Sequence, residues 1–365
     1  MSPHALRSGS RTRAAALLLA AITTLGALAG CSRADDSSSG ASGPTSPATE
    51  VRLGYFPNIT HAPALIGLKQ NLFTAELGNT KLTPQPFNAG PDEVNALLGE
   101  SLDIGFIGSG PAINAFTKSG GEAVRLVAGA TSAGAQLVTA PGITSPAQLR
   151  GKTIATPQLG NTQDIALKTW LKQNNLPIGS GPDAVTVQNI DNPQTLDLFK
   201  QGKVAGGWLP EPWSSRLVEA GAKVLVDEKS LWPEGKFPTT VVLVRTKFLQ
   251  EHPETVKAVL TGEQKAIEAA KADPAKAKAT ANDAIKDVTG KALPASVVDR
   301  SFTELSFDSD PLASTFPQLA KNSVTAGIAK DEAKLTGFLD PRPVDEVRKA
   351  AGLAPVDPGA LADTN

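Results

Sequence analysis

Residues 51–73 read VRLGYFPNITHAPALIGLKQNLF, and they contain the pattern from which the fold is predicted. The run 51–56 has the short, largely apolar character of a β-strand, and Pro57 ends it. An amphipathic pattern that begins near Ala62 predicts a helix. The loop between them is dense in hydrogen-bonding groups and contains His61, one of only three histidines in the chain. The stretch therefore predicts a strand, a polar loop and a helix in that order.

The same strand–loop–helix order recurs through residues 51–226. Further candidate strands are LDIGFIG (102–108), VRLVAGA (124–130), KTIAT (152–156), AVTVQNI (184–190), VAGGWL (204–209) and KVLV (223–226). Strands that alternate with helices of about ten residues are typical of α/β proteins with mainly parallel sheets. After a β-rich run at 239–245 the chain becomes rich in Ala, Lys and Glu, which predicts helices to about residue 353.

The N-terminus has the pattern of an export signal. Three arginines precede the apolar run 14–30, which is too short and too one-sidedly basic for a membrane span. LAGC (28–31) resembles the bacterial lipobox, so residues 1–31 are predicted to be a lipoprotein signal ending in the lipidation site Cys31. An ordinary signal peptide with an incidental cysteine is the alternative. Residues 32–50 are rich in Gly, Ser and Pro and are predicted to be a disordered tether.

This N-terminus predicts the location of the protein. We expect a lipid anchor on the extracytoplasmic face of the bacterial cell membrane, on the periplasmic or cell-wall side. Cys31 is the sole cysteine, so no intrachain disulfide is expected. The 35 Lys and Arg nearly balance the 36 Asp and Glu, which gives no electrostatic reason to expect nucleic acid as a partner.

Catalytic and metal motifs are missing from the sequence. Outside the predicted signal, His61 and His252 lie far apart, and neither HExxH nor a cysteine pair is present, so no metal site is expected. Around Ser109, Ile107 and Pro111 occupy the positions where a nucleophile elbow needs glycine. The phosphate-binding motif GxxxxGK[ST] is also missing. We therefore expect no enzyme activity and no cofactor.

Four polar or glycine-rich loops follow candidate strands and precede candidate helices. They are PNITHAP (57–63), GSGP (108–111), TPQLGNTQD (156–164) and WLPEPW (208–213). Ligands of open α/β sheets bind at the carboxyl ends of strands, where helix N-termini offer free N–H groups to an anion. The loops contain no Lys or Arg, so an anion would be held by amides, hydroxyls and helix dipoles. Any one loop could be merely a capped turn, but four together favour a shared cleft.

Four longer stretches resemble one protein family. VRLGYFPNITHAPALIGLKQNLF (51–73), SLDIGFIGSGPAINAF (101–116), LRGKTIATPQLGNTQD (149–164) and GGWLPEPWSSRLVEAGAKVLVDE (206–228) are similar to the solute-binding lipoproteins of ABC importers. The branch resembled is the one for aliphatic sulfonates, taurine and nitrate. The similarity covers about residues 51–250 and specifies the ligand less well than the family, because binders of thiamine-pyrimidine precursors share the scaffold.

The resemblance implies a two-lobed type II periplasmic-binding-protein fold. Mixed, mainly parallel sheets flanked by helices would form two lobes that close over a ligand in the cleft between them. Lobe one would comprise residues 51–135 and 242–353, lobe two would comprise 136–241, and 354–365 would be a loose tail. The implied partners are a small solute and the transmembrane permease subunits of the importer. A monomer is expected.

The resemblance and the four loops together give a set of expected ligand-binding residues. The set is Asn58, His61, Ser109, Gly110, Thr131 and Ser132 from lobe one, and Thr156, Gly160, Asn161, Thr162, Trp208, Glu211 and Trp213 from lobe two.

Four of these residues have a plain structural alternative. Asn58 would contact the ligand, or it could be a turn former. His61 would donate to an anionic headgroup, or it could be a loop histidine bonded to backbone carbonyls. The two tryptophans of 208–213 would form an apolar wall, although Trp208 could equally be core. Glu211 would hold the ammonium of a taurine-like zwitterion, or it could be a carboxylate that stabilises a helix start.

The predicted function is capture of an aliphatic sulfonate or taurine and delivery to a permease. The same role with nitrate or a thiamine-pyrimidine precursor is the alternative, as is a non-catalytic sensor or adhesion lipoprotein. An enzyme on the same bilobal fold is disfavoured. A heme-biosynthesis deaminase needs a cofactor-bearing cysteine, and a pyrimidine-precursor synthase needs a His/Cys-rich patch; the sequence outside the predicted signal has neither.

Overall fold

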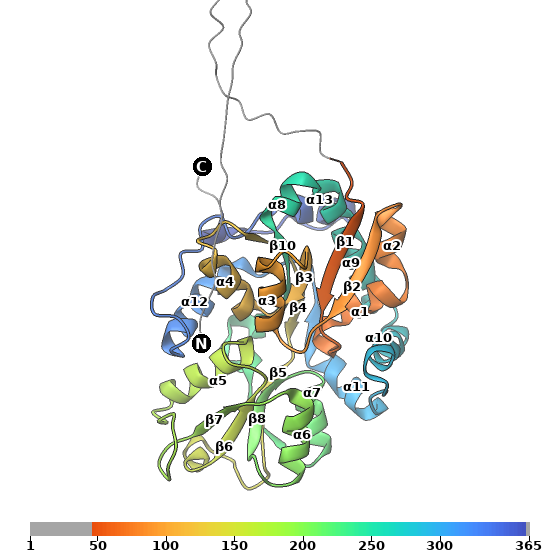
Figure 1. The fold of residues 1–365 in the computed structure, drawn as a ribbon. Helices are drawn as coiled ribbons and strands as arrows, with labels where there is room; N and C mark the ends of the chain where they lie inside the picture. The colour runs from red at the N-terminus through yellow and green to blue at the C-terminus, as the bar shows by residue number, and fades with distance from the viewer. Residues whose placement is uncertain (1–45, 363–365) are drawn as a thin grey trace, which may run out of the picture. The chain divides into compact units, whose positions relative to one another are not determined.

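The computed structural model describes residues 46–362, and Figure 1 shows the arrangement of their strands and helices. The predicted signal peptide, the candidate lipidation site Cys31 and positions 32–45 of the predicted tether lie outside the described residues. The described strands form two separate sheets. We refer to them as the first sheet and the second sheet.

The first sheet has six strands in the order β11–β4–β10–β3–β1–β2. Parallel pairing joins β1 to β2 and β3, whereas β10 pairs antiparallel with β3 and β4, and β11 antiparallel with β4. The inner strand β3 is buried along its whole length, as its continuous apolar sequence predicts. The bounds are β1 Glu50–Tyr55, β2 Lys81–Pro86, β3 Ile104–Ile107, β4 Val124–Ala133, β10 Pro238–Arg245 and β11 Leu305–Phe307.

The second sheet has five strands in the order β7–β6–β8–β5–β9. Here β6 is parallel to β7 and β8, and β5 is antiparallel to β8 and β9. The bounds are β5 Ala135–Thr139, β6 Thr153–Thr156, β7 Thr186–Asn189, β8 Gly206–Pro210 and β9 Lys223–Asp227. Each sheet has its own hydrophobic core: Leu53, Phe106 and Val242 belong to that of the first, Ile154 and Trp208 to that of the second.

The predicted α/β class with two mixed sheets and flanking helices is confirmed, but the expectation of mainly parallel sheets is wrong. Parallel pairs occur where a helix carries the chain back over the sheet. Between β4 of the first sheet and β5 of the second sheet lies only Gly134, which has a φ of 77°. The chain returns from β9 of the second sheet to β10 of the first sheet without an intervening α-helix. Without a crossover helix, β5 and β10 insert antiparallel to their neighbours.

The helices begin where the sequence provides a start signal. Proline occupies the first turn of α1, α3, α6, α9 and α10, where its missing N–H group removes no helical hydrogen bond, and Asn161 caps α5 with its side chain. The bounds are α1 Ala62–Lys69, α2 Leu72–Leu77, α3 Gly90–Leu98, α4 Ser109–Lys118, α5 Thr162–Gln173, α6 Asn192–Lys200, α7 Trp213–Glu219, α8 Thr246–Glu251, α9 Pro253–Ala272, α10 Pro274–Thr289, α11 Ala295–Thr303, α12 Phe316–Thr325 and α13 Arg342–Ala350.

The C-terminal helices do not keep to the first sheet. Helices α9 and α10 pack on α1, as the assignment of residues 242–353 to lobe one requires, but α11 packs on α7 and α12 on α5, which flank the second sheet. The strands also change sheets slightly earlier than the predicted boundaries at 136 and 242, since β5 begins at Ala135 and β10 at Pro238. The exact lobe boundaries stay a prediction.

Both expected loose ends are partly packed. Within the predicted tether, the Ala48 amide donates to Thr255 Oγ1 at 2.9 Å, its carbonyl accepts from the Thr80 hydroxyl at 2.6 Å, and Glu50 already begins β1. In the predicted tail, Val356 and Leu361 are buried. Apolar side chains at these positions find space against the first core, which a reading based on composition overlooks.

Candidate functional site

The four predicted junctions meet around one small cavity, which we call the inner cavity. Its volume is about 30 Å³, room for about two water molecules. The four junctions contribute Asn58, Thr60 and His61, then Gly108 and Pro111, then Pro157, Asn161, Thr162 and Gln163, and finally Pro210. The remaining lining residues are Phe56, Asn88, Ala89, Gly90, Asn192 and Thr239. The cavity therefore lies where the sequence predicted a cleft, at the carboxyl ends of the strands.

Helix N-termini surround this cavity. His61 precedes α1, Ala89 precedes α3, Gly108 precedes α4 and Asn161 precedes α5, while Asn192 is the first residue of α6. Each helix end presents unpaired N–H groups and a partial positive charge of about half an elementary unit. Lys, Arg, Asp and Glu do not contribute to the lining of this cavity. The potential there is consequently set by helix ends rather than by charged side chains.

The N-termini of α4 and α5, which follow strands of different sheets, are in direct contact. The Gly110 amide donates to Thr162 Oγ1 at 3.3 Å. A Cβ at Gly108 would lie 2.5 Å from the same hydroxyl, so glycine is needed for this approach. On α5, Asn161 Oδ1 accepts from the Asp164 amide at 2.8 Å, which fixes the helix start. The second and third of the four junctions are thus in direct contact.

His61 is buried, and both ring nitrogens are already bonded. Nε2 lies 3.0 Å from the carbonyl oxygen of Phe106, which can only accept, so Nε2 carries the proton. Nδ1 then accepts from the Thr60 hydroxyl at 3.1 Å. Burial lowers the pKa of His61 to about 3, and the ring is neutral at physiological pH. This geometry corresponds to the structural alternative for His61, with no ring nitrogen free for an anion.

Asn58 connects the first and fourth junctions. Its Oδ1 accepts from Trp213 Nε1 at 2.9 Å, and beside it the Thr60 amide donates to the Glu211 carbonyl at 3.4 Å. Because Trp213 can only donate, the bond orients the Asn58 amide and leaves its two N–H groups for other partners. Asn58 lines the inner cavity, and its predicted ligand contact stays a prediction.

Thr156 and Gly160 serve the shape of the third junction. The Thr156 hydroxyl donates to Asp164 Oδ1 at 2.9 Å, and the Gly160 amide donates to Asp164 Oδ2 at 2.9 Å. Asp164 is fully buried and forms an ion pair of 2.7 Å with Lys168. This network holds the loop 156–164 in place, and neither Thr156 nor Gly160 lines the inner cavity.

Three further predicted donors lie outside the inner cavity lining. The hydroxyls of Ser109 and Thr131 are buried without a hydrogen-bond partner, and Ser132 Oγ accepts from the Phe237 amide at 3.2 Å. Thr131 and Ser132 lie in β4, at its pairing with β10 and β11. Both residues thus lie within a paired strand and outside the lining of the inner cavity, and their expected ligand contact stays a prediction.

Glu211 is buried in an ion pair. Its Oε1 accepts from Arg300 Nη1 at 3.0 Å, and its Oε2 accepts from the Ser301 hydroxyl at 2.8 Å and the Ser215 amide at 3.2 Å. Burial raises the pKa of Glu211, against the lowering effect of the serines and Arg300. The carboxylate therefore stabilises the start of α7 and the docking of α11, and it does not reach the inner cavity.

Trp208 is a core residue. Its side chain is fully buried in the second core, and Nε1 donates to Glu228 Oε2 at 2.6 Å. Burial raises the pKa of Glu228 to about 8. The core alternative stated for Trp208 fits this placement, because β8 is buried along its whole length.

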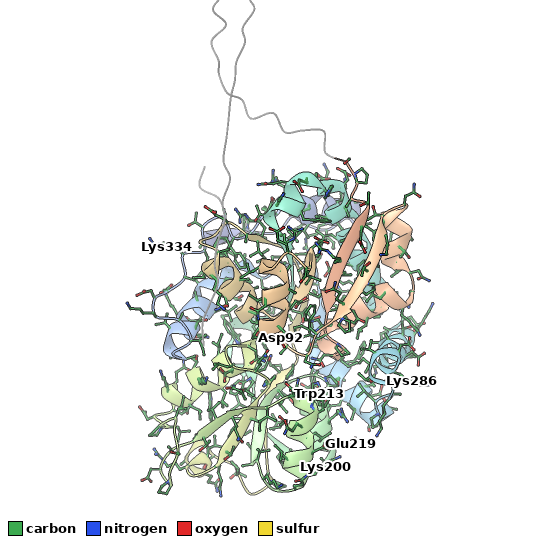
Figure 2. All side chains as sticks on the ribbon, viewed as in Figure 1. Asp92, Lys200, Trp213, Glu219, Lys286 and Lys334 are labelled. Carbon is green, nitrogen blue, oxygen red and sulfur yellow. The ribbon has the colours of Figure 1, made fainter. Side chains whose placement is uncertain are left out.

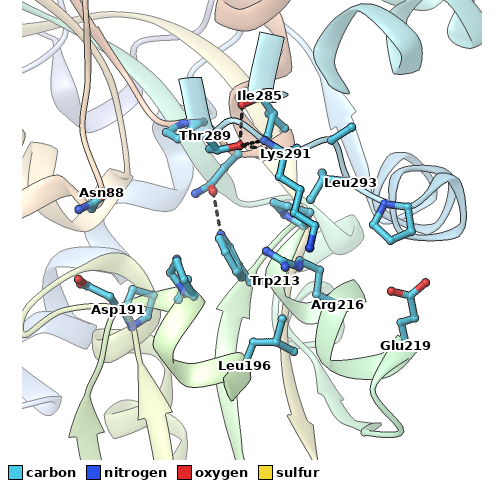
Figure 3. Close-up of a pocket in the computed structure, with 18 of the residues that line it drawn as sticks. Asn88, Asp191, Leu196, Trp213, Arg216, Glu219, Ile285, Thr289, Lys291 and Leu293 are labelled. Atoms are coloured by element: carbon cyan, nitrogen blue, oxygen red, sulfur yellow. Dashed lines mark hydrogen bonds between the residues drawn. The ribbon is translucent and has the colours of Figure 1, made fainter. Parts of the chain in front are cut away.

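A larger cavity of about 620 Å³, the outer cavity, adjoins the inner one and shares Asn58, Asn88, Pro157 and Asn192 with it. Figure 2 places Trp213 between the elements of the two sheets. Trp213, Phe87 and Leu196 are among the apolar lining residues, and Figure 3 shows the surrounding side chains. The predicted apolar wall is thus present for Trp213. Charged groups also line this cavity: Lys200, Arg216, Lys291, Asp191 and Glu219.

Sequence reasoning missed two junctions that line both cavities, Asn88 after β2 and Asn192 after β7. Both follow a strand and precede a helix, so the rule applied to the four junctions would have found them. It could not have found Arg216 or Lys291, which lie on α7 and after α10 without a motif.

Two negative findings apply to residues 46–362. They contain no group of three or more His, Cys, Asp or Glu side chains placed to hold a metal ion. Their helices include none that combines the length and the apolar character needed to cross a bilayer.

Comparisons with known proteins identify relatives. A model of the NMT1-like family matches residues 44–285. The taurine-binding periplasmic protein of Escherichia coli (strain K12) is 31% identical over 199 residues, covering 54% of this chain and 59% of that protein. The match thus spans little more than half the length of this curated relative.

Solved structures share the fold. The alkanesulfonate-binding protein of Xanthomonas axonopodis pv. citri, bound to MOPS, has a TM-score of 0.65 at 20% identity, covering 79% of this chain and 96% of that one. The periplasmic nitrate-binding protein of Synechocystis PCC 6803 has a TM-score of 0.67 at 16% identity, covering 85% and 92%. The predicted periplasmic-binding-protein fold and the resemblance to the taurine, sulfonate and nitrate branch are confirmed.

Proposed function

The chain belongs to the NMT1-like family, and from this premise we propose that it is the extracytoplasmic solute-binding protein of an ABC importer. It captures a small organic anion between its two lobes and delivers it to a permease. An aliphatic sulfonate or taurine is the proposed solute. The protein binds its solute without chemical change.

One observation carries this proposal: the N-termini of five helices surround a cavity that has no charged lining side chain. Such an arrangement attracts an anion through backbone N–H groups and dipoles. The inner cavity of about 30 Å³ suits an anionic headgroup rather than a whole ligand.

The side chains around the cavity support binding rather than catalysis. General acid–base chemistry at neutral pH needs a group whose pKa lies near 7. His61 is the titratable side chain of the inner cavity, and its pKa of about 3 keeps it neutral and unable to deliver a proton at that pH. Both of its nitrogens are used within the protein.

Hydrogen bonds between the junctions of the first sheet and those of the second sheet support closure around the solute. Gly110 of α4 bonds to Thr162 of α5, and Asn58 beside β1 bonds to Trp213 of α7. An anion that contacts helix ends on both sides stabilises this closed arrangement over an open one. The closed form is the one that a permease would recognise.

Ligand identity is tested by isothermal titration calorimetry of the purified protein with methanesulfonate, taurine, nitrate and a 4-aminopyrimidine. We expect binding of the sulfonates with a Kd in the micromolar range or below, and a matching thermal shift. Binding of nitrate or the aminopyrimidine without any sulfonate would overturn the sulfonate assignment. Binding of none of the four would overturn the proposed function.

A pair of variants links binding to the inner cavity. Asn161→Ala removes the cap of α5 at the cavity, and Asp273→Ala removes the equivalent cap of α10 away from it. Both caps contribute about 1 kcal/mol to the free energy of unfolding. We expect only Asn161→Ala to weaken sulfonate binding, by about ten-fold. Equal affinities in the two variants would place the solute elsewhere.

We further propose that Cys31 anchors the protein to the membrane by lipidation, and that the protein acts as a monomer beside its permease. The lipobox-like LAGC supports the anchor. Metabolic labelling with a fatty acid should mark the wild-type protein and not Cys31→Ser, and the variant should leave the membrane fraction. Membrane retention of an unlabelled Cys31→Ser protein would contradict the anchor.

A further inference from the structure

Three cationic side chains line the outer cavity, and burial lowers the pKa of one of them, Arg216, against the raising effect of the charges of Asp197 and Glu219. Lys200 ends α6, Arg216 lies on α7 and Lys291 follows α10. Among residues 46–362, none of the three side chains forms an ion pair or a side-chain hydrogen bond. The guanidinium of Arg216 stacks on Trp213, with 4.5 Å from its carbon to the ring centroid. Its five N–H donors are consequently left for another acceptor.

The geometry of the cations favours an anion between them. Figure 3 shows Lys291 extending towards Arg216 over the middle of the cavity, with Asp191 on one side and Glu219 on the other. Glu219 Oε1 accepts from the Ser296 hydroxyl at 2.6 Å, and its charge acts on Arg216 without an ion pair between the two side chains among residues 46–362. Lys291 is exposed and Arg216 is half-buried, so solvent screens part of the interaction between them. An anionic group that bonds to both side chains would gain from each charge.

Apolar surface separates these cations from the inner cavity. Trp213, Phe87 and Leu196 line the outer cavity, and Asn58 and Asn192 line both cavities. Asn192 Oδ1 is buried without a partner at this passage. The volume of about 620 Å³ exceeds what a two-carbon solute such as taurine fills. A ligand that spans both cavities needs an anionic head, an apolar body and a second anionic group.

Resting on the proposed function, we propose that the preferred solute is a dianion: a sulfonate whose apolar, ring-sized body carries a second acid group. The sulfonate occupies the inner cavity at the helix ends. The body lies along Trp213, and the second acid group, a carboxylate or another sulfonate, binds Arg216 and Lys291. A bidentate acceptor matches the fork of the guanidinium, whose stacking on Trp213 fixes its plane.

The test compares two probes with the same ring. Isothermal titration calorimetry of the purified protein measures 4-sulfobenzoate, a dianion, against benzenesulfonate, a monoanion. We expect 4-sulfobenzoate to bind at least ten-fold tighter at low salt, and the ratio to fall as ionic strength rises. Equal affinities, or tighter binding of benzenesulfonate, would overturn the proposal and leave the proposed function intact. Failure of both ring probes together with methanesulfonate and taurine would overturn the proposed function itself.

Variants assign the preference to the named residues. Arg216→Gln and Lys291→Gln should each reduce the ratio of the two affinities by several fold, and the double variant should bring it near one. Benzenesulfonate affinity should fall less than 4-sulfobenzoate affinity in each variant, because benzenesulfonate lacks the second acid group. Lys286→Gln, on the same side of the molecule but outside the lining, makes the same change in charge and should leave the ratio unchanged. If Lys286→Gln lowered the ratio of the two affinities as much as Arg216→Gln does, the effect would come from net charge alone. That result would overturn the assignment of the second acid group to Arg216 and Lys291.

Discussion

At the scale of single residues, burial changes what a side chain can do. His61 and Glu228 are both fully enclosed, and each bonds to a group inside the protein. Desolvation disfavours the charged form of both groups, so the histidine loses its proton and the carboxyl keeps its own. Both shifts predict a measurable dependence of stability on pH.

The pKa of His61 is about 3 in the folded protein and about 6.5 in an unfolded chain. Between these values the unfolded state binds a proton that the folded state does not, so stability falls as the pH falls below about 6.5. We expect His61→Gln to lower the free energy of unfolding at pH 7. The variant should also lose the dependence of that free energy on pH, which is about 1.4 kcal/mol per pH unit for one proton. Urea unfolding of both proteins from pH 7 to pH 5 measures it. Parallel pH profiles of the two proteins would contradict the neutral, buried ring.

For Glu228 the sign is reversed. Its pKa is about 8 in the folded protein, so the folded state holds a proton that the unfolded state has released above its ordinary value. Stability from this group is therefore complete below about pH 4.5 and is lost as the pH rises towards 8. Glu228→Gln keeps an acceptor for Trp208 Nε1 and should be more stable than the wild type at pH 8, with little difference at pH 5. Thermal unfolding at the two pH values decides this, and the same difference at both would refute it.

At the scale of elements, the strand-to-helix junctions are what line the inner cavity. Each junction brings a helix N-terminus to the carboxyl edge of a sheet, and glycines set how closely two such ends approach. The contact between α4 and α5 depends on the space at Gly108. A methyl group there would push the two helix ends apart.

We therefore expect Gly108→Ala to weaken sulfonate binding by ten-fold or more and to lower the free energy of unfolding by about 1–3 kcal/mol, as overpacking does. Calorimetry and urea unfolding measure the two effects. Gly142→Ala is the matched control, since a Cβ there meets no atom within 4 Å. Wild-type affinity in Gly108→Ala would show that the α4–α5 contact is not needed for binding.

At the scale of the whole molecule, the C-terminal helices join elements of the two sheets. Helix α11 packs on α7, and the ion pair between the buried Glu211 and the half-buried Arg300 lies within that contact. Removing one partner of a buried pair costs more than the pair itself contributes, because the other charge is left without compensation. This pair is therefore a sensitive probe of the contact.

Arg300→Met should destabilise the protein by about 3 kcal/mol at pH 7, because Glu211 then stays buried without its cation. The double variant Arg300→Met/Glu211→Gln should recover part of this loss. Asp299→Asn on the same helix breaks the exposed pair with Lys278 and should cost less than about 1 kcal/mol. Urea unfolding compares the four proteins. A loss for Arg300→Met as small as that for Asp299→Asn would contradict the role of the pair.

The sequence by itself determined the α/β class and the position of the inner cavity. Both follow from local rules: apolar periodicity sets strands and helices, and parallel strands that precede helices place their loops at one edge. Asn58, Asn161 and Thr162 were predicted and line that cavity. The sequence also left open the core alternative for Trp208, which fits its full burial in the middle of β8.

Only the tertiary structure decided the antiparallel insertion of β5 and β10, the bonding of both His61 nitrogens and the pairing of Glu211 with Arg300. Each depends on segments far apart in the chain, and the partner of a buried polar group cannot be found from its own neighbourhood. The cations of the outer cavity belong to the same class, because Arg216 and Lys291 are 75 residues apart in the chain and meet only in the fold. Interactions between neighbouring residues set where strands and helices begin and end, whereas packing between distant segments decides which buried polar groups bond to each other.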